Sequence, residues 1–145
     1  MADMMKRVPV AEQEPKVRAK NFEEVCLGYT EKEAMEEAVR CLNCRNPKCV
    51  VGCPVSIQIN EFIHEVKEGN IEKAAEVIAR SSALPAVCGR VCPQETQCEG
   101  VCIRGIKGEP VAIGKLERFV ADWAREHGFQ AAKAGEPNGK KVAVI

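Results

Sequence analysis

The sequence predicts an all-α domain over residues 30–128. An extended arm over residues 1–29 precedes it, and a linker with the first β-strand of a further domain follows over residues 129–145. Apolar residues recur at helical spacing in several segments of the central region, and no strand-like alternation is found before Val142. Aromatic residues make up only 4% of the chain. We therefore expect a core of Ala, Val, Ile and Leu, with metal centres acting as internal staples.

The first 29 residues predict an extended arm because they are rich in proline and charge and are interrupted by helix breakers. We expect this arm to lie over the helical domain. Its expected anchors are three apolar side chains, Phe22, Val25 and Leu27.

A capping box predicts the start of the first helix. Thr30 precedes Glu33 by three residues, the spacing at which the two side chains satisfy backbone N–H groups at a helix start. Apolar residues at helical spacing follow: Ala34, Met35, Ala38, Val39 and Leu42. We expect the last turn of this helix to deliver Cys41 and Cys44.

Two further helices are predicted to form a hairpin. Asn60 is the expected N-cap of the first, which ends at Gly69, and Asn70 is expected to cap the second. Their apolar residues are Phe62, Ile63 and Val66, and then Ile71, Ala74, Ala75 and Ile78. Because almost no chain separates the two helices, we expect them to pack against each other.

A final helix is predicted from about Ile113 to His127, ended by Gly128. Its apolar face carries Ile113, Leu116, Val120, Trp123 and Ala124, and its charged face carries Lys115, Arg118, Asp122, Arg125 and Glu126. Glu117 falls within the apolar sector, where a carboxylate needs a partner or a metal. Two interpretations are open: an ion pair with a nearby Arg or Lys, or ligation of an iron.

The end of the chain predicts the opening of a second domain. A linker rich in Gly, Pro, Asn and Lys leads to Lys141–Ile145, which has the pattern of a buried strand. A Gly-x-Gly-x-x-Gly motif would follow such a strand in a dinucleotide-binding unit, and none lies within the 145 residues. We expect the chain alone to bind neither flavin nor nicotinamide and to be a fragment of a longer flavoprotein.

Eight of the nine cysteines form two compact blocks, C-x2-C-x4-C-x3-C-P and C-x3-C-P-x4-C-x3-C. They are Cys41, Cys44, Cys49 and Cys53, and then Cys88, Cys92, Cys98 and Cys102. The bacterial ferredoxin run C-x2-C-x2-C-x3-C-P has a similar arrangement, and its last cysteine ligates the other cluster of a pair. The blocks therefore predict two iron–sulfur clusters that exchange ligands between them.

Disulfides and structural zinc are the alternatives for these cysteines. Disulfide frameworks are typical of short secreted chains, whereas this N-terminus has no signal-peptide core and the cysteine count is odd. Structural zinc usually takes two C-x2–4-C pairs separated by a longer stretch, which fits the dense block from Cys41 to Cys53 less well. Reduced thiols without an export signal predict a cytoplasmic protein.

Charge and hydropathy exclude two classes of partner. The 21 basic and 21 acidic residues give a net charge of zero, which argues against a nucleic-acid partner. No stretch approaches the length of a membrane-spanning helix, so no membrane partner is expected.

Six motifs together resemble one known family. They are Gly28–Thr30, Arg40–Cys44, Gly52–Pro54, Leu84–Pro93, Cys98–Cys102 and Ile113–Phe119. The set resembles the N-terminal iron–sulfur domain of the glutamate synthase small subunit, and it covers essentially the whole chain. The larger subunit of NADH-dependent ferredoxin:NADP oxidoreductase and the N-terminal part of dihydropyrimidine dehydrogenase are relatives. The resemblance implies an alpha-helical ferredoxin-like fold that precedes FAD- and NADPH-binding domains.

The resemblance also implies the ligands of two [4Fe–4S] clusters. Cluster 1 would be held by Cys41, Cys44, Cys49 and Cys102. Cluster 2 would be held by Cys53, Cys92, Cys98 and Glu117, the last at the position of a glutamine in dihydropyrimidine dehydrogenase. Counting cysteines alone would instead give two all-cysteine sites that include Cys88 and leave Cys26 free. We follow the family pattern, because a carboxylate within an apolar stripe otherwise has no explanation.

The function implied by the resemblance is electron transfer. The clusters would pass electrons singly between FAD, reduced by NADPH in the full-length protein, and a redox centre on the glutamate synthase large subunit or an equivalent flavoprotein partner. The chain alone has no complete active site. The alternatives are a subunit fragment of a bifurcating ferredoxin:NADP oxidoreductase and a metal-stapled structural docking domain, and a redox titration separates the docking domain from an electron carrier.

Overall fold

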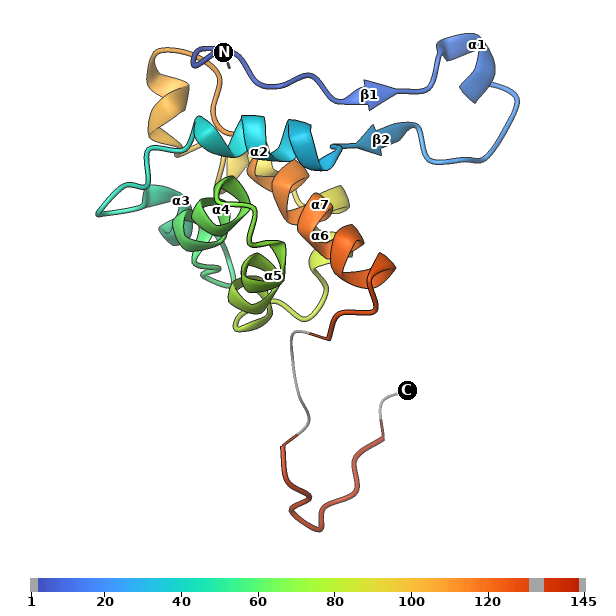
Figure 1. Ribbon diagram of the computed structural model, residues 1–145, viewed down its shortest axis with the longest axis vertical. Helices are drawn as coiled ribbons and strands as arrows, with labels where there is room; N and C mark the ends of the chain where they lie inside the picture. The colour runs from blue at the N-terminus through green and yellow to red at the C-terminus, as the bar shows by residue number, and fades with distance from the viewer. Residues whose placement is uncertain (1–2, 131–134, 144–145) are drawn as a thin grey trace.

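Nearly all regular structure in the described residues is helical (Figure 1). The computed structural model describes residues 3–130 and 135–143. The longer helices are α2 (Glu31–Val39), α4 (Ile59–Lys67), α5 (Ile71–Ala79), α6 (Pro85–Val91) and α7 (Ile113–Glu126). Shorter elements are α1 (Pro15–Arg18), α3 (Lys48–Val51), the 3-10 helices Gln94–Thr96 and Ile103–Ile106, and the strands β1 (Ala11–Glu12) and β2 (Cys26–Gly28). The all-α fold class is confirmed. None of the helices in the described ranges is long and apolar enough to cross a membrane.

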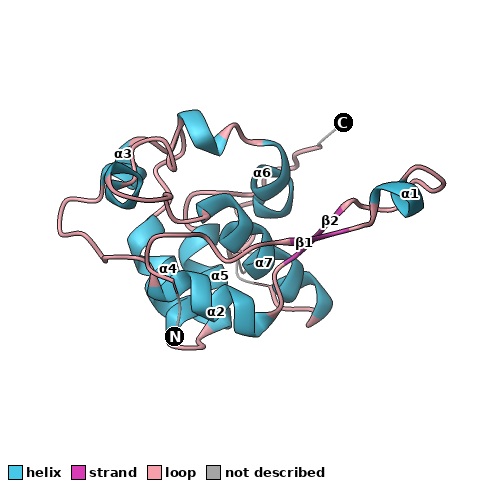
Figure 2. Cartoon of the chain, turned by 90° about the horizontal axis from the view of Figure 1, so that it is seen from above, coloured by secondary structure: helices cyan, strands magenta, loops and turns pink. Residues whose placement is uncertain are grey.

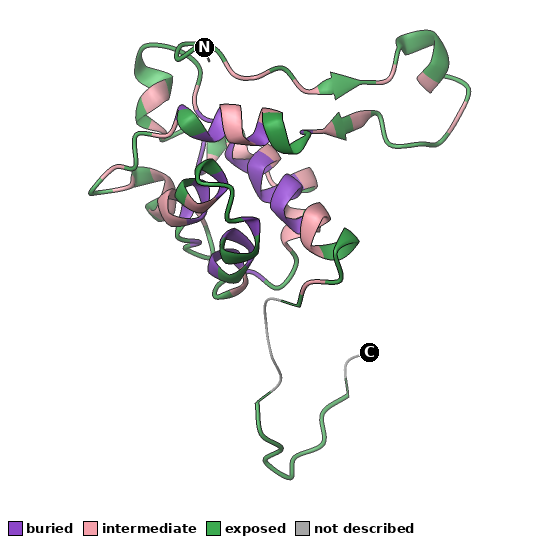
Figure 3. Ribbon diagram, viewed as in Figure 1, coloured by how far each residue is buried: buried purple, intermediate pink, exposed green. Residues whose placement is uncertain are grey.

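The core lies where α4 and α5 meet α2 and α7 (Figure 3). Helices α4 and α5 form the predicted hairpin, and Gly69 between them has a φ of 78°, which favours glycine. Fully buried side chains at this junction include Phe62, Ile63, Val66, Ile78 and Leu116. Burial of each such side chain contributes about 1.5–3 kcal/mol. A continuous core therefore forms with few aromatic residues.

Three of the four predicted helix starts are confirmed and one is wrong. Asn70 directly precedes α5 as predicted, although its side chain donates to Glu65 Oε2 at 2.9 Å and makes no cap hydrogen bond. Thr30 and Glu33 form the predicted capping box, in which the Thr30 N–H donates to Glu33 Oε2 at 2.8 Å. The final helix begins at Ile113, as predicted. Helix α4 begins before Asn60, and the Asn60 side chain donates to Asn43 Oδ1 at 3.3 Å instead of capping the helix.

Helix α6 is absent from the sequence prediction, which treated Leu84–Val87 only as a lead into the second cysteine block. A glycine among its seven residues weakens the helical signal. The same glycine explains its packing, because a Cβ at Gly89 would lie 2.7 Å from the backbone nitrogen of Arg118 in α7. Gly89 thus lets α6, which carries Cys88, cross closely over α7, which carries Glu117.

Gly89→Ala is expected to destabilise the protein by about 1–3 kcal/mol, because the added methyl group meets backbone atoms that cannot rotate away. This loss exceeds the gain of about 1 kcal/mol in helix propensity. Gly105→Ala is the matched control, since its Cβ would meet Pro110 at an ordinary 3.6 Å. Urea midpoints measure both effects, and a Gly89→Ala midpoint equal to that of Gly105→Ala would contradict the close crossing.

The arm contains a hairpin that projects from the helical body (Figures 1 and 2). Strands β1 and β2 pair antiparallel, with Ala11 opposite Gly28. The sequence analysis expected no strand in this region. The three expected anchors are exposed, and that prediction is wrong: they are Phe22, Val25 and Leu27. They lie on the projecting hairpin or beside its strands, away from the apolar core.

Polar contacts hold the start of the arm on the body. The side chain of Arg7 forms an ion pair with Glu99, which is 5% exposed and neighbours Cys98. The Glu99 Oε1 atom also accepts the backbone N–H of Gly114 at 3.1 Å. The Tyr29 hydroxyl donates to a carbonyl of the arm at 2.7 Å. The arm is therefore held on the body by these hydrogen bonds and by Val8 and Val10, which pack against the core, and not by the three expected anchors.

The hairpin covers part of the face of α7 that the sequence analysis described as charged. Arg118 is only 4% exposed, although the helical pattern placed it on the solvent side. Its Nη2 atom donates to the carbonyl oxygen of Cys26 at 2.9 Å and pairs with Glu24 at 3.2 Å. Arg118 is buried because the hairpin covers it, and the periodicity of a helix carries no information about such a covering strand.

Residues 135–143 are exposed and form neither helix nor strand. The strand expected over Lys141–Ile145 is not formed in its described part, 141–143, and residues 144–145 lie outside the described residues. A strand needs a neighbour that accepts and donates its backbone hydrogen bonds. The only sheet in the described chain is the β1–β2 pair.

Candidate iron–sulfur centres

Four thiols from both cysteine blocks line one hollow beside α4. They belong to Cys41, Cys44, Cys49 and Cys102. The hollow has an empty volume of about 420 Å³ and is otherwise lined mainly by apolar side chains, among them Ile59, Ile63 and Val111. The four residues are the ones that the resemblance assigns to cluster 1.

The loop after α2 presents the first two of these sulfurs. The sequence analysis expected Cys41 and Cys44 in the last turn of this helix. Helix α2 ends at Val39, so both cysteines lie in the loop that follows it. Asn43 between them has a φ of 46°, a left-handed conformation that asparagine tolerates. This turn brings both cysteines to the same hollow.

The thiols of this group influence one another electrostatically. Burial raises the pKa of Cys49 to about 11, and the charges of Cys102 and Cys41 add to the rise. Burial also raises the pKa of Cys41, with Cys102 and Cys44 adding, while the backbone N–H of Asn43 opposes the rise. A bound metal centre would reverse these shifts, because metal ions bind the thiolate form and displace its proton.

A second group lies where α6 and its neighbouring loops meet α7. The pKa of Cys98 is raised to about 12, first by burial, with the charges of Cys53 and Glu117 among the further causes. The pKa of Cys92 is raised by burial, and the charges of Glu117 and Cys53 contribute again. Three separate segments of the chain therefore bring together the residues that the resemblance assigns to cluster 2: Cys53, Cys92, Cys98 and Glu117.

Glu117 is a buried carboxylate with an oxygen that has no hydrogen-bond partner. The residue is 8% exposed, its Oε1 atom accepts no hydrogen bond, and burial raises its pKa to about 7. It forms no ion pair within residues 3–130 and 135–143, so the ion-pair interpretation is wrong. An unsatisfied buried polar group costs about 1–3 kcal/mol. The donor is thus well suited to a metal.

Cys88 is also close to the second group. It lies one helical turn before Cys92, and its charge contributes to the raised pKa of Cys92. The Cys88 carbonyl accepts a hydrogen bond from Gln94 Nε2 at 3.1 Å. Both candidates for the eighth ligand, Cys88 and Glu117, therefore lie near Cys92.

The donors of neither group converge on one point within the described residues, and those of the first group line a hollow. All nine cysteines are free, so the disulfide alternative is wrong. In the part of the chain that the structure describes, no three Cys, His, Asp or Glu side chains are close enough to hold one metal ion. Structural zinc needs four donors at about 2.0–2.3 Å from a single centre. An iron–sulfur cubane presents four separate irons to its ligands, which suits wider spacing.

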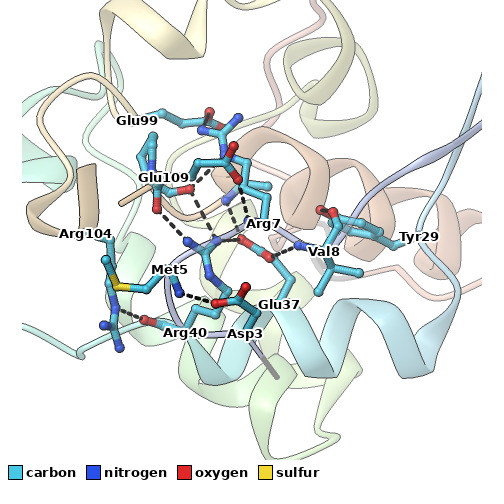
Figure 4. A network of polar contacts seen from close by, with 12 residues as sticks. Asp3, Met5, Arg7, Val8, Tyr29, Glu37, Arg40, Glu99, Arg104 and Glu109 are labelled. Carbon is cyan, nitrogen blue, oxygen red and sulfur yellow. Dashed lines mark hydrogen bonds and ion pairs between the residues drawn. The ribbon is translucent and has the colours of Figure 1, made fainter. Parts of the chain in front are cut away.

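A buried ion pair beside the first group was missed by the sequence analysis (Figure 4). Glu37 and Arg40 are both fully buried, and Arg40 Nη1 donates to Glu37 Oε1 at 2.5 Å. Glu37 also accepts the backbone N–H groups of Val8 and Ala112, each at 2.8 Å. The pair fixes the residue that directly precedes Cys41. The only sequence signal for the Glu37–Arg40 pair is the spacing of an acid and a base three residues apart, which is equally typical of exposed helix faces.

Comparisons with known proteins place the chain among 4Fe-4S domains. The protein-family model described as dihydropyrimidine dehydrogenase domain II, 4Fe-4S cluster, matches residues 18–129. The glutamate synthase [NADPH] small chain of Escherichia coli (strain K12) is 39% identical over 142 residues, which cover 97% of this chain and 30% of that protein. The glutamate synthase [NADPH] small chain of Halomonas elongata is 40% identical over 144 residues, which cover 95% of this chain and 30% of that protein. The NAD-dependent dihydropyrimidine dehydrogenase subunit PreT of Escherichia coli (strain K12) is 37% identical over 124 residues, covering 86% and 30%.

Together, the helical fold and the grouped thiols are those of an iron–sulfur domain. The chain belongs to the 4Fe-4S family represented by domain II of dihydropyrimidine dehydrogenase, which the match over residues 18–129 shows. It is a domain of the type found in glutamate synthase small chains and in PreT, which implies electron transfer. The chain spans about 30% of the length of these curated relatives.

Proposed function

We propose that this chain holds two [4Fe–4S] clusters. They relay electrons one at a time between FAD, which NADPH reduces, and a redox centre of a partner protein. The observation that supports the proposal is that the expected ligands lie in two places: four thiols line one hollow, and Cys53 and Glu117 act electrostatically on both Cys92 and Cys98. Each group combines residues from both parts of the chain, as in the ferredoxins whose last cysteine serves the other cluster. Cluster 1 takes Cys41, Cys44, Cys49 and Cys102, and cluster 2 takes Cys53, Cys92, Cys98 and Glu117.

The buried oxygen of Glu117 supports the second ligand set. A carboxylate that has neither a hydrogen bond at Oε1 nor a cation beside it is costly in an apolar helix face. Iron ligation would offset that cost. Because burial raises the pKa of Glu117 to about 7, loss of its proton near neutral pH makes it available as a ligand.

The chain's own residues prepare both sites for one-electron chemistry. When bound, the clusters supply Fe²⁺/Fe³⁺ exchange. Thiolates and Glu117 hold the irons, and backbone N–H groups, such as that of Asn43 at Cys41, stabilise negative charge on sulfur. Apolar side chains around the first group, including Ile63 and Ile113, limit access of water. A shell of this kind stabilises and tunes a cluster without taking part in bond making.

The relatives support the proposed place of the domain in a larger protein. The match to a glutamate synthase [NADPH] small chain supports NADPH as the electron source and the large subunit, or an equivalent flavoprotein, as the partner. FAD- and NADPH-binding domains would follow the linker in the full-length protein. We accordingly divide the chain into an arm (1–29), a two-cluster domain (30–128) and the start of the FAD-binding domain (129–145). We place the protein in the cytoplasm, where thiols stay reduced.

Iron, acid-labile sulfide and zinc contents of anaerobically purified protein test the proposal. We expect about eight irons and about eight sulfides per chain, with a broad absorbance band that bleaches on reduction with dithionite. An EPR-monitored redox titration should then show two one-electron centres. Stoichiometric zinc without sulfide, persisting after anaerobic reconstitution, would contradict the proposal and favour a structural docking domain.

A further inference from the structure

Arg104 places a positive charge at the first thiol group. It follows Cys102 by two residues in the 3-10 helix Ile103–Ile106, and it lines the same hollow as the four thiols. The side chain is half-buried. Among residues 3–130 and 135–143, no carboxylate lies within ion-pair distance of it. Lys48 also lines the hollow, but it is exposed, so solvent and salt screen its charge more strongly.

A hydrogen bond fixes the position of this cation. Arg104 Nε donates to the carbonyl oxygen of Arg40 at 2.6 Å (Figure 4). Arg40 directly precedes Cys41, whereas Arg104 closely follows Cys102, so the bond joins the two segments that supply the ligands of cluster 1. The charge of Arg40 itself is compensated by Glu37 at 2.5 Å. Arg104 is therefore the half-buried guanidinium whose charge acts on the hollow without a neutralising partner.

We propose that Arg104 is a positioning residue that raises the reduction potential of cluster 1 and clamps its two ligand segments together. The inference rests on the proposed function and adds to it the residue that sets this potential. Reduction adds a negative charge to the cluster, and a fixed cation in a partly buried site stabilises the reduced form more than the oxidised form. Among the described residues, the charges that act most strongly on Cys92 and Cys98 come from other thiols, Glu99 and Glu117, and Arg104 is not one of them, so the effect should be confined to cluster 1.

Arg104→Gln, Arg104→Lys and Lys107→Gln in the reconstituted protein test this inference. Lys107 is the matched control, because it is an exposed cation at the end of the same 3-10 helix and does not line the hollow. Iron and sulfide are counted first, and the potentials are then measured by EPR-monitored titration. The EPR signals are assigned to the two clusters with Cys44→Ser and Cys53→Ser. Fewer than about eight irons in the unsubstituted protein would refute the proposed function before any variant is compared.

We expect Arg104→Gln to make cluster 1 about tenfold harder to reduce, which lowers its potential by about 59 mV. Cluster 2 should be unchanged, Arg104→Lys should restore most of the potential, and Lys107→Gln should match the unsubstituted protein. Unchanged potentials in a fully loaded Arg104→Gln protein would overturn the inference. If Arg104→Gln loses the iron of cluster 1, Arg104→Lys decides between the outcomes. Iron retained in Arg104→Lys at the original potential of cluster 1 supports the inference. Loss of this iron in Arg104→Lys as well overturns the effect of the Arg104 charge on the potential.

Discussion

Replacing Glu117 with alanine is expected to remove about half of the iron, from about eight to about four atoms per chain, because the proposed cluster 2 would lose one of its four protein ligands. The helix itself should tolerate the change, since alanine is a good helix former and the removed carboxylate has an unsatisfied oxygen. Iron and sulfide contents after anaerobic reconstitution measure the loss. Redox titration should show that the EPR signal of cluster 1 is retained.

Two further variants control this experiment. Glu117→Gln should keep both clusters, because the amide oxygen of glutamine still offers lone pairs to a metal. Cys88→Ser should also keep both, although Cys88 lies beside Cys92. If Cys88→Ser lost a cluster while Glu117→Ala kept two, the all-cysteine assignment would be correct and the ligand role of Glu117 would be wrong.

Arg40→Met is expected to lower the free energy of unfolding by about 3–5 kcal/mol, since it leaves the Glu37 carboxylate buried without its cation. It also removes the hydrogen bond from Arg40 Nη2 to the carbonyl oxygen of Glu109 at 2.5 Å. The arm should loosen at the same time, because Glu37 accepts the backbone N–H of Val8. Urea unfolding of anaerobic protein measures the change.

An exposed ion pair provides the control for Arg40→Met. Arg80 pairs with Glu61 at 2.8 Å, and their side chains are 57% and 43% exposed. Arg80→Met should therefore cost no more than about 1 kcal/mol. Equal effects of Arg40→Met and Arg80→Met would show that burial of the Glu37–Arg40 pair does not govern its contribution.

Local signals predicted the elements that depend on local interactions. The Thr30–Glu33 capping box involves side chains three residues apart, so the sequence contains both partners. The final helix was likewise predictable from its periodicity and from Gly128, which has a φ of 61°. Helix α6 was not, because its stability depends on packing of Gly89 against α7, a contact between residues far apart in the chain. The prediction of the arm's anchors was wrong for the same reason, because the polar contacts that hold the arm join it to residues far away in the chain.

In the candidate site, too, local features could be predicted from the sequence and contacts between distant residues could not. Cysteine spacing predicts that clusters are present, and the charge of Glu117 within an apolar stripe marks it as unusual. Which thiols share a group depends on how the chain folds back, and only the resemblance could anticipate that Cys102 joins Cys41. No pattern in the sequence indicated the contact from Arg104 to the Arg40 carbonyl. A hydrogen bond between a side chain and a distant backbone oxygen leaves no periodic trace.

The interlaced ligand sets have a consequence for how the protein is made. A nascent chain that has emerged only as far as Cys53 holds three ligands of one proposed cluster and one of the other. Neither centre can be completed until Cys98 and Cys102 have left the ribosome, and the second also waits for Glu117. Under the proposed assignment, iron delivery would therefore be completed only in a nearly finished domain. Once in place, each centre closes a loop that spans most of the helical body, so partial translation products cannot retain a complete cluster.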